Sequence, residues 1–316
     1  MMKAAIIRKY KQKNIELAEM PSPTIGEEDV LVEIHAASIN PIDYKVRDGK
    51  LKLLLHYNMP LILGNDFSGV IYEVGAKVTK FKKGDEVYGR PRKSRIGTFA
   101  EYLAVHENEL ALKPKNLSFE QAAAVPLVGL TTYQAFHEKM NLQPHDRILI
   151  QAGAGGVGTF AIQLAKQMGA YVATTTSSKN SELVTSLGAD RVVDYRHENF
   201  DDVLSDYDYV YDTLGGENLL RAFSIVKPGG KIVSISGLPN ERFAKSYGVP
   251  FWKRKLFRLA TRNISKLEKQ THVLYDFLFM KPSGEQLQLL SKLIEEEKYV
   301  EAANIADMID WRRVKS

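Results

Sequence analysis

The stretch that decides the fold is "QAGAGGVGTFAIQLAKQMGA", residues 151–170, where four glycines fall within six positions before a helix-forming run. The short apolar run "RILIQ" at 147–151 precedes it and is typical of a buried strand. An amphipathic helix is expected over 157–168, ended by Gly169. Strand, glycine turn and helix in this order open a βαβ unit, a context that favours a dinucleotide-binding loop over a purely structural turn.

Each glycine of the Gly153-x-Gly155-x-x-Gly158 pattern has an expected role. Gly153 permits a tight turn, Gly155 lets the backbone approach a pyrophosphate, and Gly158 lets the helix pack on the strand. Gly156 and Val157 would lie at the helix N-terminus, whose free N–H groups and dipole favour phosphates.

Strand-length runs continue after this loop and alternate with helical segments. They are "AYVATTT", "RVVDY", "DYVYDTL" and "KIVSISG", at 170–176, 191–195, 208–214 and 231–237. Such alternation predicts an α/β fold with a doubly wound parallel sheet. Before residue 118, short β-branched runs separated by turns predict a mainly antiparallel β domain. A helical region starts with Ser118 as N-cap and Gln121 three residues later.

The end of the strand at 170–176 indicates which dinucleotide is preferred. An acid there would bind the ribose 2′-hydroxyl of NAD, but the chain reads Thr174 to Lys179 without an acid before Glu182. The hydroxyls of Ser177 and Ser178, with Lys179, suit a 2′-phosphate, so NADPH is favoured. The alternative is that the serines cap the next helix and the lysine is solvated.

Composition limits the remaining chemistry. The chain has 316 residues, a net charge of +5 and no cysteine, which excludes disulfides, thiolate metal sites and a cysteine nucleophile. No apolar run approaches a membrane span and the N-terminus does not resemble a secretory signal, so we expect a cytoplasmic protein. No nucleic-acid motif accompanies the basic charge.

Several motifs together resemble the medium-chain dehydrogenase/reductases, specifically their zinc-independent quinone and enone oxidoreductases. They are "NPIDYKVRDG", "GNDFSG", "GLTTYQAF", "AGAGGVG", "LGADRVVDY" and "VKPGG". The resemblance implies a Rossmann domain, a GroES-like β-barrel catalytic domain and a homodimer. Residues 1–120 would form the catalytic domain, 121–280 the NADPH-binding Rossmann domain, and 281–316 a C-terminal segment returning to the catalytic domain.

Zinc-dependent relatives place a cysteine where this chain has Asn40, and "GHE" where it has Gly64, Asn65 and Asp66. Asparagine is a poor zinc ligand, so no metal site is expected. The resemblance also implies that Tyr195 lies near the 2′-phosphate and Thr131 near the nicotinamide amide. Further cofactor contacts would come from Leu214, Gly215, Gly216, Ser236 and Gly237.

Catalytic groups are expected in "SINPIDYKVRDG". Reduction of an enone leaves an enolate oxygen that needs a hydrogen-bond donor. By resemblance, Asn40 would contact substrate or the nicotinamide ribose, and Lys45 would hydrogen-bond the ribose or stabilise the oxyanion. Tyr44 is a second candidate donor. Asp66 is expected to hold the loop through neighbours such as Asp43 or Lys45, and the proton could come from water.

Two segments depart from the family pattern. Residues 239–270 are strongly basic and carry Phe251, Trp252 and Phe257, which is consistent with a lid, a helix with one face packed on the domain, or peripheral membrane contact. At the C-terminus, "YVEAANIADMIDWRRVKS" stands where a strand, a further helix and a final strand are expected, which predicts a substitute helix or an unclosed edge of the β domain.

The sequence therefore predicts NADPH-dependent, zinc-free reduction of quinones or α,β-unsaturated carbonyls, with a small carbonyl or quinone compound as partner. Two alternatives remain open at this point. One is a zinc-free alcohol dehydrogenase, which would need a base or metal. The other is an NADPH-binding protein whose basic surface contacts RNA or membranes.

Overall fold

A computed structural model describes residues 1–52, 54–296 and 308–310. The chain divides into two compact units, one comprising residues 1–130 and 281–316 and the other residues 131–280. Within the part that the structure describes, no helix is both long and apolar enough to span a bilayer.

The second unit is built on a six-stranded parallel sheet in the order β11-β10-β9-β12-β13-β14. Its strands are β9 (Arg147–Ile150), β10 (Tyr171–Thr176), β11 (Arg191–Asp194), β12 (Tyr207–Asp212), β13 (Val226–Ser234) and β14 (Leu274–Phe277). The strand order reverses between β9 and β12, as in doubly wound folds. This confirms the predicted parallel sheet, although β14 was not predicted from the sequence.

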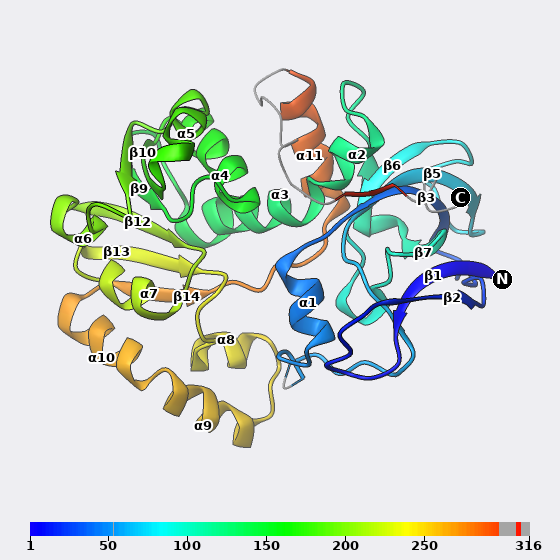
Figure 1. Ribbon diagram of the computed structural model, residues 1–316, viewed down its shortest axis with the longest axis horizontal. Helices are drawn as coiled ribbons and strands as arrows, with labels where there is room; N and C mark the ends of the chain where they lie inside the picture. The colour runs from blue at the N-terminus through cyan, green and yellow to red at the C-terminus, as the bar shows by residue number, and fades with distance from the viewer. Residues whose placement is uncertain (53, 297–307, 311–316) are drawn as a thin grey trace. The chain divides into compact units, whose positions relative to one another are not determined.

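Helices cover both faces of this sheet (Figure 1). The helices α4 (Gly156–Gln167) and α5 (Ser181–Ser186) lie on one face, and a core cluster packs α6 (Phe200–Val203), α7 (Gly216–Ala222) and α10 (Arg262–Thr271) on the other. The unit also contains the 3₁₀ turn η4 (Ser178–Asn180) and the helices α8 (Glu241–Ser246) and α9 (Phe251–Ala260).

The helical region that begins at Ser118 is divided into three parts. Ser118 and Gln121 form the expected capping box at the start of α2 (Phe119–Ala123). A new helix, α3 (Pro126–Tyr133), begins at Pro126, which lacks an N–H but suits a first helical position. It continues as the π-helical η3 (Gln134–Met140).

The first unit is an antiparallel β domain, as predicted. One sheet has the order β2-β1-β4, and the other has the order β15-β3-β5-β6-β8 with β7 also paired to β3. The strands are β1 (Met2–Ile7), β2 (Glu16–Met20), β3 (Asp29–Ser38), β4 (Leu61–Ile62), β5 (Phe67–Val74), β6 (Glu86–Gly89), β7 (Tyr102–His106), β8 (Leu110–Leu112) and β15 (Met308–Asp310). The unit also holds α1 (Pro41–Arg47), the 3₁₀ turns η1 (Lys93–Arg95) and η2 (Glu107–Glu109), and α11 (Gly284–Glu295).

The C-terminal part of the chain joins this β domain. The hydroxyl of Tyr88 on β6 donates a 2.7 Å hydrogen bond to the carbonyl of Leu287 on α11, and Ser291 Oγ lies 3.0 Å from the same hydroxyl. The backbones are also close, because a Cβ on Gly284 would lie 2.3 Å from the carbonyl oxygen of Leu110. Helix α11 is therefore an integral part of the first unit.

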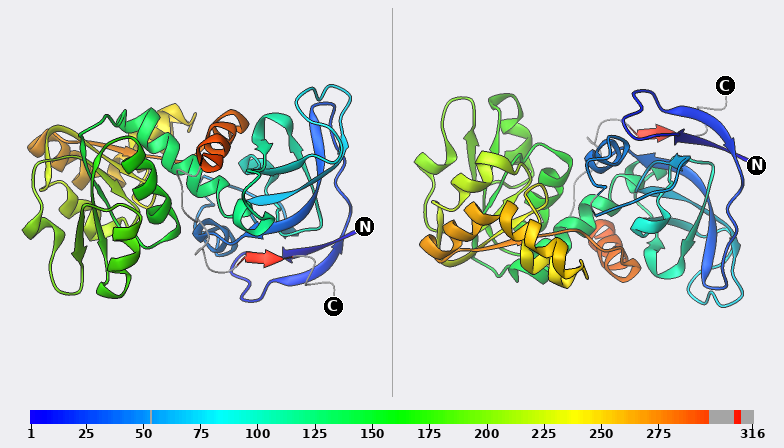
Figure 2. Two further views of the ribbon diagram at one scale, coloured as in Figure 1. Left: turned by 90° about the horizontal axis from the view of Figure 1, so that it is seen from above. Right: turned by 90° about the horizontal axis from the view of Figure 1, so that it is seen from below.

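Strand β15 covers the edge of β3, where the sequence predicted an open edge. Strand β15 pairs antiparallel with β3 and places Met308 opposite Ser38 and Asp310 opposite Ala36. Figure 2 shows β15 as a short red arrow beside the blue N-terminal strands. The prediction of an unclosed edge is wrong at these positions, while residues 297–307 and 311–316 of the same segment lie outside the described residues.

Candidate functional site

The glycine loop after β9 is shaped by close packing. A Cβ on Gly153 would lie 2.0 Å from Thr174 Oγ1, and one on Gly158 would lie 2.4 Å from the carbonyl oxygen of Ala152. A Cβ on Gly155 would meet only that same carbonyl oxygen, at 3.3 Å. Gly153 and Gly158 are thus sterically required, whereas a Cβ on Gly155 would make a single tight contact. The positive φ of the loop, 52°, belongs to Ala152.

Two threonines of β10 hold this loop against the sheet. Thr175 Oγ1 accepts a 3.0 Å hydrogen bond from the Ala152 amide, and the Thr175 carbonyl accepts one of 2.9 Å from Gly153. The Thr174 hydroxyl donates to the carbonyl of Ile150 at 2.7 Å. Both threonine side chains therefore serve the loop.

Helix α4 begins at Gly156 with Gly155 as N-cap, and no side chain caps it. The first N–H groups of a helix have no partner within the helix. Together with the helix dipole, they form a site that favours an anion such as a phosphate. Gly155 lines a cavity, which leaves room for one.

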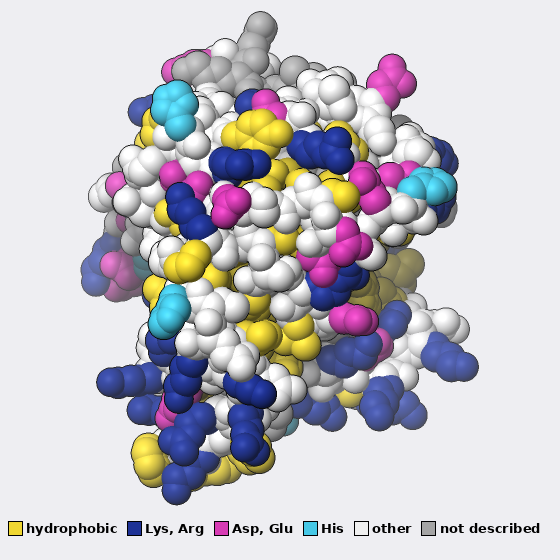
Figure 3. Space-filling model, turned by 90° about the vertical axis from the view of Figure 1, so that its left-hand side faces the viewer, with side chains coloured by type: hydrophobic (Ala, Val, Ile, Leu, Met, Phe, Trp, Pro, Cys, Tyr) yellow, Lys and Arg dark blue, Asp and Glu magenta, His cyan; other side chains and the backbone are white. Residues whose placement is uncertain are grey.

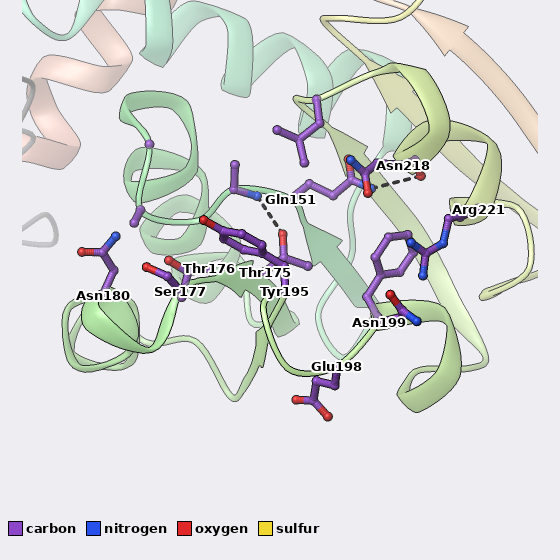
Figure 4. Close-up of a pocket in the computed structure, with 15 residues that line it drawn as sticks. Gln151, Thr175, Thr176, Ser177, Asn180, Tyr195, Glu198, Asn199, Asn218 and Arg221 are labelled. Atoms are coloured by element: carbon purple, nitrogen blue, oxygen red, sulfur yellow. Dashed lines mark hydrogen bonds between the residues drawn. The ribbon is translucent and has the colours of Figure 1, made fainter.

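A cavity of about 550 Å³ lies beside this helix terminus (Figure 4). Four of the predicted cofactor-binding residues line it: Gly155, Ser177, Tyr195 and Leu214. The remaining lining residues were not predicted and are Gln151, Ala152, Ala154, Thr175, Thr176, Asn180, Glu198, Asn199, Phe200, Asn218 and Arg221. Gln151 and Thr176 stand at the ends of β9 and β10, a position that could have identified them, whereas Asn218 and Arg221 lie on α7.

Gln151 provides a free acceptor at the cavity. The side chain is fully buried, its Nε2 donates to the Asn218 carbonyl at 3.4 Å, and its Oε1 has no hydrogen-bond partner in the described structure. A buried acceptor without a partner is costly unless a ligand supplies a donor. The cavity, Gln151 and the uncapped helix terminus together fit a dinucleotide.

The end of β10 presents polar side chains to the cavity. Ser177 is 7% exposed and Asn180 also lines the cavity, whereas Ser178 and Lys179 are exposed on η4. Tyr195, after β11, is 61% exposed. The structure thus brings Ser177 and Tyr195 to one cavity and leaves Ser178 and Lys179 outside its lining.

One carboxylate at this edge was not anticipated. Asp194, the last residue of β11, accepts hydrogen bonds from the backbone amides of Arg196 at 3.0 Å and Ser178 at 2.9 Å. These bonds, the one from Arg196 most of all, lower the pKa of Asp194. Its negative charge is therefore used to fix the turn that carries Ser178.

The charged residues that line the cavity already have partners. Arg221 binds Asp201 with a 2.9 Å bond from Nε to Oδ2, and its guanidinium lies over the Phe200 ring, 5.3 Å from the centroid. Glu198 lies 3.7 Å from Arg191. These pairs shape the wall of the cavity and leave its net charge near balance.

The ends of β12 and β13 are joined by a buried carboxylate. Asp212 accepts hydrogen bonds from the amides of Leu214 at 3.1 Å and Gly215 at 2.7 Å, and also from the Ser234 hydroxyl. Burial raises the pKa of Asp212. Ser234 Oγ in turn accepts from Gly237 at 2.7 Å.

This network positions the loops of several predicted residues, namely Leu214, Gly215, Gly216, Ser236 and Gly237. Asp212 and Ser234, which hold those loops, were not predicted. Thr131, the remaining predicted cofactor residue, is buried on α3.

The three predicted catalytic residues lie together at α1 in the first unit. Asn40 is the N-cap and 5% exposed, Tyr44 is 45% exposed, and Lys45 is half-buried. The backbone N–H of Asn40 donates a 2.7 Å hydrogen bond to Asp43 Oδ2, which fixes the start of the helix.

The side chain of Asp66 is hydrogen-bonded to Asn40 at the start of α1. Asp66 Oδ2 accepts hydrogen bonds from Asn40 Nδ2 at 3.1 Å and from Ser38 Oγ at 2.9 Å. The expectation that Asp66 holds the loop through Asp43 or Lys45 is wrong about its partners: they are Asn40 and Ser38. Asp66 Oδ1 is buried without a hydrogen-bond partner in the described structure.

A second buried carboxylate lies beside the first. Asp43 Oδ1 accepts from Asn65 Nδ2 at 2.7 Å, and Asn65 Oδ1 accepts from Arg90 at 3.1 Å. Burial raises the pKa of Asp43 to about 6 and that of Asp66 to about 7, the latter raised further by the neighbouring charge of Asp43. The positive charge of Arg90 partly opposes both shifts.

These side chains do not fit a zinc site. The amide nitrogens of Asn40 and Asn65 point at the carboxylates of Asp66 and Asp43 as donors, so both carboxylates are engaged by side-chain amides. Among the described residues, no three His, Asp or Glu side chains are grouped as metal ligands would be.

Comparison with known proteins identifies both domains. Residues 26–115 match the alcohol dehydrogenase GroES-like domain, and residues 156–272 match the zinc-binding dehydrogenase family. The latter name describes the family, not a metal in this chain.

Individual relatives are similar in sequence and structure. The chain is 45% identical over 224 residues to a 2-methylene-furan-3-one reductase of Solanum lycopersicum and 41% identical over 223 residues to a chloroplastic NADPH-dependent alkenal/one oxidoreductase of Arabidopsis thaliana. Each match covers 68% of this chain but only 56% and 57% of those relatives.

Longer matches cover nearly the whole chain. A mitochondrial NAD(P)H oxidoreductase of Danio rerio, RTN4IP1, is 34% identical over 94% of this chain and 82% of its own length. The quinone oxidoreductase of Coxiella burnetii superposes with a TM-score of 0.78 at 34% identity, over 94% of this chain and 88% of that one. The chain therefore belongs to the medium-chain dehydrogenase/reductase superfamily, among relatives that are NAD(P)H-dependent quinone and alkenal oxidoreductases.

Proposed function

We propose that this protein reduces quinones or α,β-unsaturated carbonyl compounds with NADPH, without zinc. The observation that carries the proposal is the cavity at the glycine loop, where an uncapped helix terminus and a buried unpaired acceptor meet. The names of the relatives, which include an alkenal/one oxidoreductase and a quinone oxidoreductase, support this substrate class.

NADPH is proposed because the end of β10 offers hydroxyl and amide groups to the cavity. Hydrogen-bond donors come from Ser177, Asn180 and Tyr195. Lys179, which precedes Asn180 on η4, carries a positive charge. The carboxylate of Asp194 accepts from two backbone amides of the adjoining turns and does not line the cavity, unlike an acid that binds the ribose 2′-hydroxyl of NAD.

When bound, the nicotinamide supplies a hydride to the electron-poor carbon of the acceptor. The protein must then stabilise negative charge on the carbonyl oxygen. Lys45 would donate to that oxygen or to the ribose, Tyr44 is a second donor on the same helix, and Asn40 would contact substrate or ribose. The amide of Asn40 is held by Asp66, which fixes its orientation.

The test follows the consumption of NADPH with a small enone, a quinone and a simple aldehyde as acceptors. We expect turnover with the enone or the quinone, weak activity with NADH, and no effect of a chelator. Tight binding of NADPH without turnover of any acceptor would contradict the enzymatic proposal. Activity that a chelator abolishes would contradict the zinc-free one.

Two further features stay predictions. The family resemblance implies a homodimer, which a measurement of mass in solution would test. The composition predicts a cytoplasmic location, although two of the relatives carry the descriptions chloroplastic and mitochondrial.

A further inference from the structure

Helix α9 (Phe251–Ala260) carries large apolar side chains on its outside. Phe251, Trp252, Leu256 and Leu259 are 69%, 65%, 57% and 69% exposed. Trp252, Leu256 and Leu259 follow the i, i+4, i+7 spacing, so they share one face of the helix. Isolated exposed apolar residues are ordinary, but four on one helix form a patch that needs an explanation.

Packing within the chain does not account for the outer face of this helix. None of the side chains described in α9 is fully buried, whereas its neighbour α10 buries Ile264 and α4 buries the consecutive residues 158–165. Ten residues form only a marginal helix without tertiary support. Arg254 and Phe257 lie on the opposite face and are partly buried, and Arg254 Nε donates a 2.6 Å hydrogen bond to the Val249 carbonyl. The interpretation of one face packed on the domain therefore accounts for this inner face, whereas the outer apolar face of α9 remains exposed.

The charges around the patch identify the kind of partner. Residues 251–267 contain six lysines and arginines and no aspartate or glutamate. Lys255 and Arg258 are exposed on α9, and Arg262 and Lys266 are exposed on α10. The ammonium group of Lys255 lies over the Phe251 ring, 5.4 Å from its centroid, so apolar and cationic groups are in direct contact.

The same arrangement is visible on the surface. In Figure 3, lysine and arginine side chains gather at the bottom of the molecule, where α9 lies, with hydrophobic side chains at the outermost edge. A second copy of the chain would bring like charges together at this patch. An anionic partner with an apolar interior would satisfy both kinds of side chain.

We propose that α9 docks on the surface of an anionic lipid bilayer. Trp252, Leu256 and Leu259 would enter the boundary between headgroups and acyl chains, while Lys255 and Arg258 remain among the anionic headgroups. Helix α10 would add Arg262 and Lys266 to the charged surface. This proposal does not depend on the oxidoreductase activity.

The test measures sedimentation of the full chain with vesicles of phosphatidylcholine alone or mixed with phosphatidylserine. We expect binding to the mixed vesicles only, and less of it at high salt because exposed charges are screened. Two variants, Leu256→Ser/Leu259→Ser and Lys255→Glu/Arg258→Glu, should each lower the partition coefficient by about tenfold or more.

Matched controls change the same residue types elsewhere. Leu17→Ser/Leu289→Ser removes leucines that are 60% and 41% exposed, and Lys9→Glu/Lys13→Glu reverses two exposed lysines. Both should bind vesicles as the wild type does. Circular dichroism of every variant would show that the fold is retained.

A spectroscopic readout follows the helix directly. The sequence has two tryptophans, so Trp311→Phe leaves Trp252 as the only one. Its emission should shift to shorter wavelength with anionic vesicles and be quenched by lipids brominated near the headgroups. Equal binding to neutral vesicles, no loss of binding in the α9 variants, or binding to a single-stranded oligonucleotide in place of vesicles would each overturn the proposal.

Discussion

The side-chain nitrogen of Asn40 lies 3.1 Å from Oδ2 of Asp66, with both residues buried at the start of α1. An asparagine held in this way has a defined orientation, because rotation of its amide would remove one of the two hydrogen bonds that Asp66 Oδ2 accepts. The arrangement separates two kinds of residue at α1: Asn40 is tied into the core, whereas Tyr44 and Lys45 extend from the helix.

Substitutions at α1 should therefore act differently on stability and on turnover. Lys45→Met should lower kcat/KM for an enone or quinone by about 100-fold, the usual effect of losing an oxyanion donor, and leave the melting temperature nearly unchanged. Tyr44→Phe should have a smaller effect. Asn40→Ala should lower both, with a loss of about 1–3 kcal/mol in the free energy of unfolding because Asp66 loses a donor. Steady-state kinetics and urea unfolding measure the two effects, and an unaltered kcat/KM in Lys45→Met would remove Lys45 from the proposed mechanism.

The buried carboxyls of the first unit predict a dependence of stability on pH. Burial raises the pKa of Asp43 to about 6 and of Asp66 to about 7, above the ordinary value of 3.8. Between about pH 4 and pH 7 the folded chain thus holds protons that the unfolded chain has released. The free energy of unfolding should fall as the pH rises through this window and the contribution of these groups should be lost above pH 7.

Asp66→Asn tests this assignment, since an amide does not titrate. Urea unfolding at a series of pH values should show that the free energy of unfolding declines less steeply in the variant between pH 4 and pH 7. The difference in slope should correspond to up to about one bound proton. The conversion of the exposed Asp206 to Asn serves as control and should leave the slope as it is. An identical slope in Asp66→Asn and wild type would mean that Asp66 is ionised throughout.

The glycine loop offers a matched pair of alanine substitutions. Gly158→Ala would place a Cβ 2.4 Å from the Ala152 carbonyl oxygen, and we expect a loss of about 1–3 kcal/mol in stability from overpacking. Gly155→Ala would make one tight contact of 3.3 Å at an ordinary φ of −81°, so the fold should lose less stability than in Gly158→Ala while affinity for NADPH falls. Thermal unfolding and cofactor titration distinguish the two. A Gly155→Ala protein that binds NADPH as tightly as wild type would show that no phosphate approaches this backbone.

Cofactor preference is tested at the end of β10. Lys179→Glu should weaken NADPH binding by about tenfold or more, because a carboxylate repels the 2′-phosphate, and change NADH binding little. Lys292→Glu, an exposed lysine of α11, is the control. If the NADPH/NADH ratio stays constant in Lys179→Glu but falls in Asn180→Asp, the phosphate contacts the lining of the cavity and not the lysine.

Local sequence patterns predicted much of the fold, but they predicted only part of the candidate site. The glycine spacing, the strand runs and the Ser118 capping box depend on neighbouring residues, so the sequence reveals them directly. Asn180, Asn218 and Gln151 meet at one cavity only because parallel strands place their ends side by side. No short-range pattern connects residues so far apart in the chain.

Buried polar partners were the hardest to predict. Asp212 and Asp66 each accept from a residue that is distant in the sequence, Ser234 and Asn40 respectively, and the sequence shows only an acid at the end of a strand or in a glycine-rich turn. The same holds for β15, whose pairing with β3 depends on a long-range contact. The exposure of α9 also could not be predicted, because its amphipathic pattern is equally typical of a helix packed on a domain.

The contact between Tyr88 and Leu287 spans 199 positions of the chain, and the entire second unit is synthesised between them. During translation, residues 131–280 emerge before α11 is available to the β domain. The parallel-sheet unit can thus complete its core first, while the N-terminal strands wait for their last helix. The first unit, although it begins the chain, therefore cannot form its last contacts until the whole second unit has been synthesised.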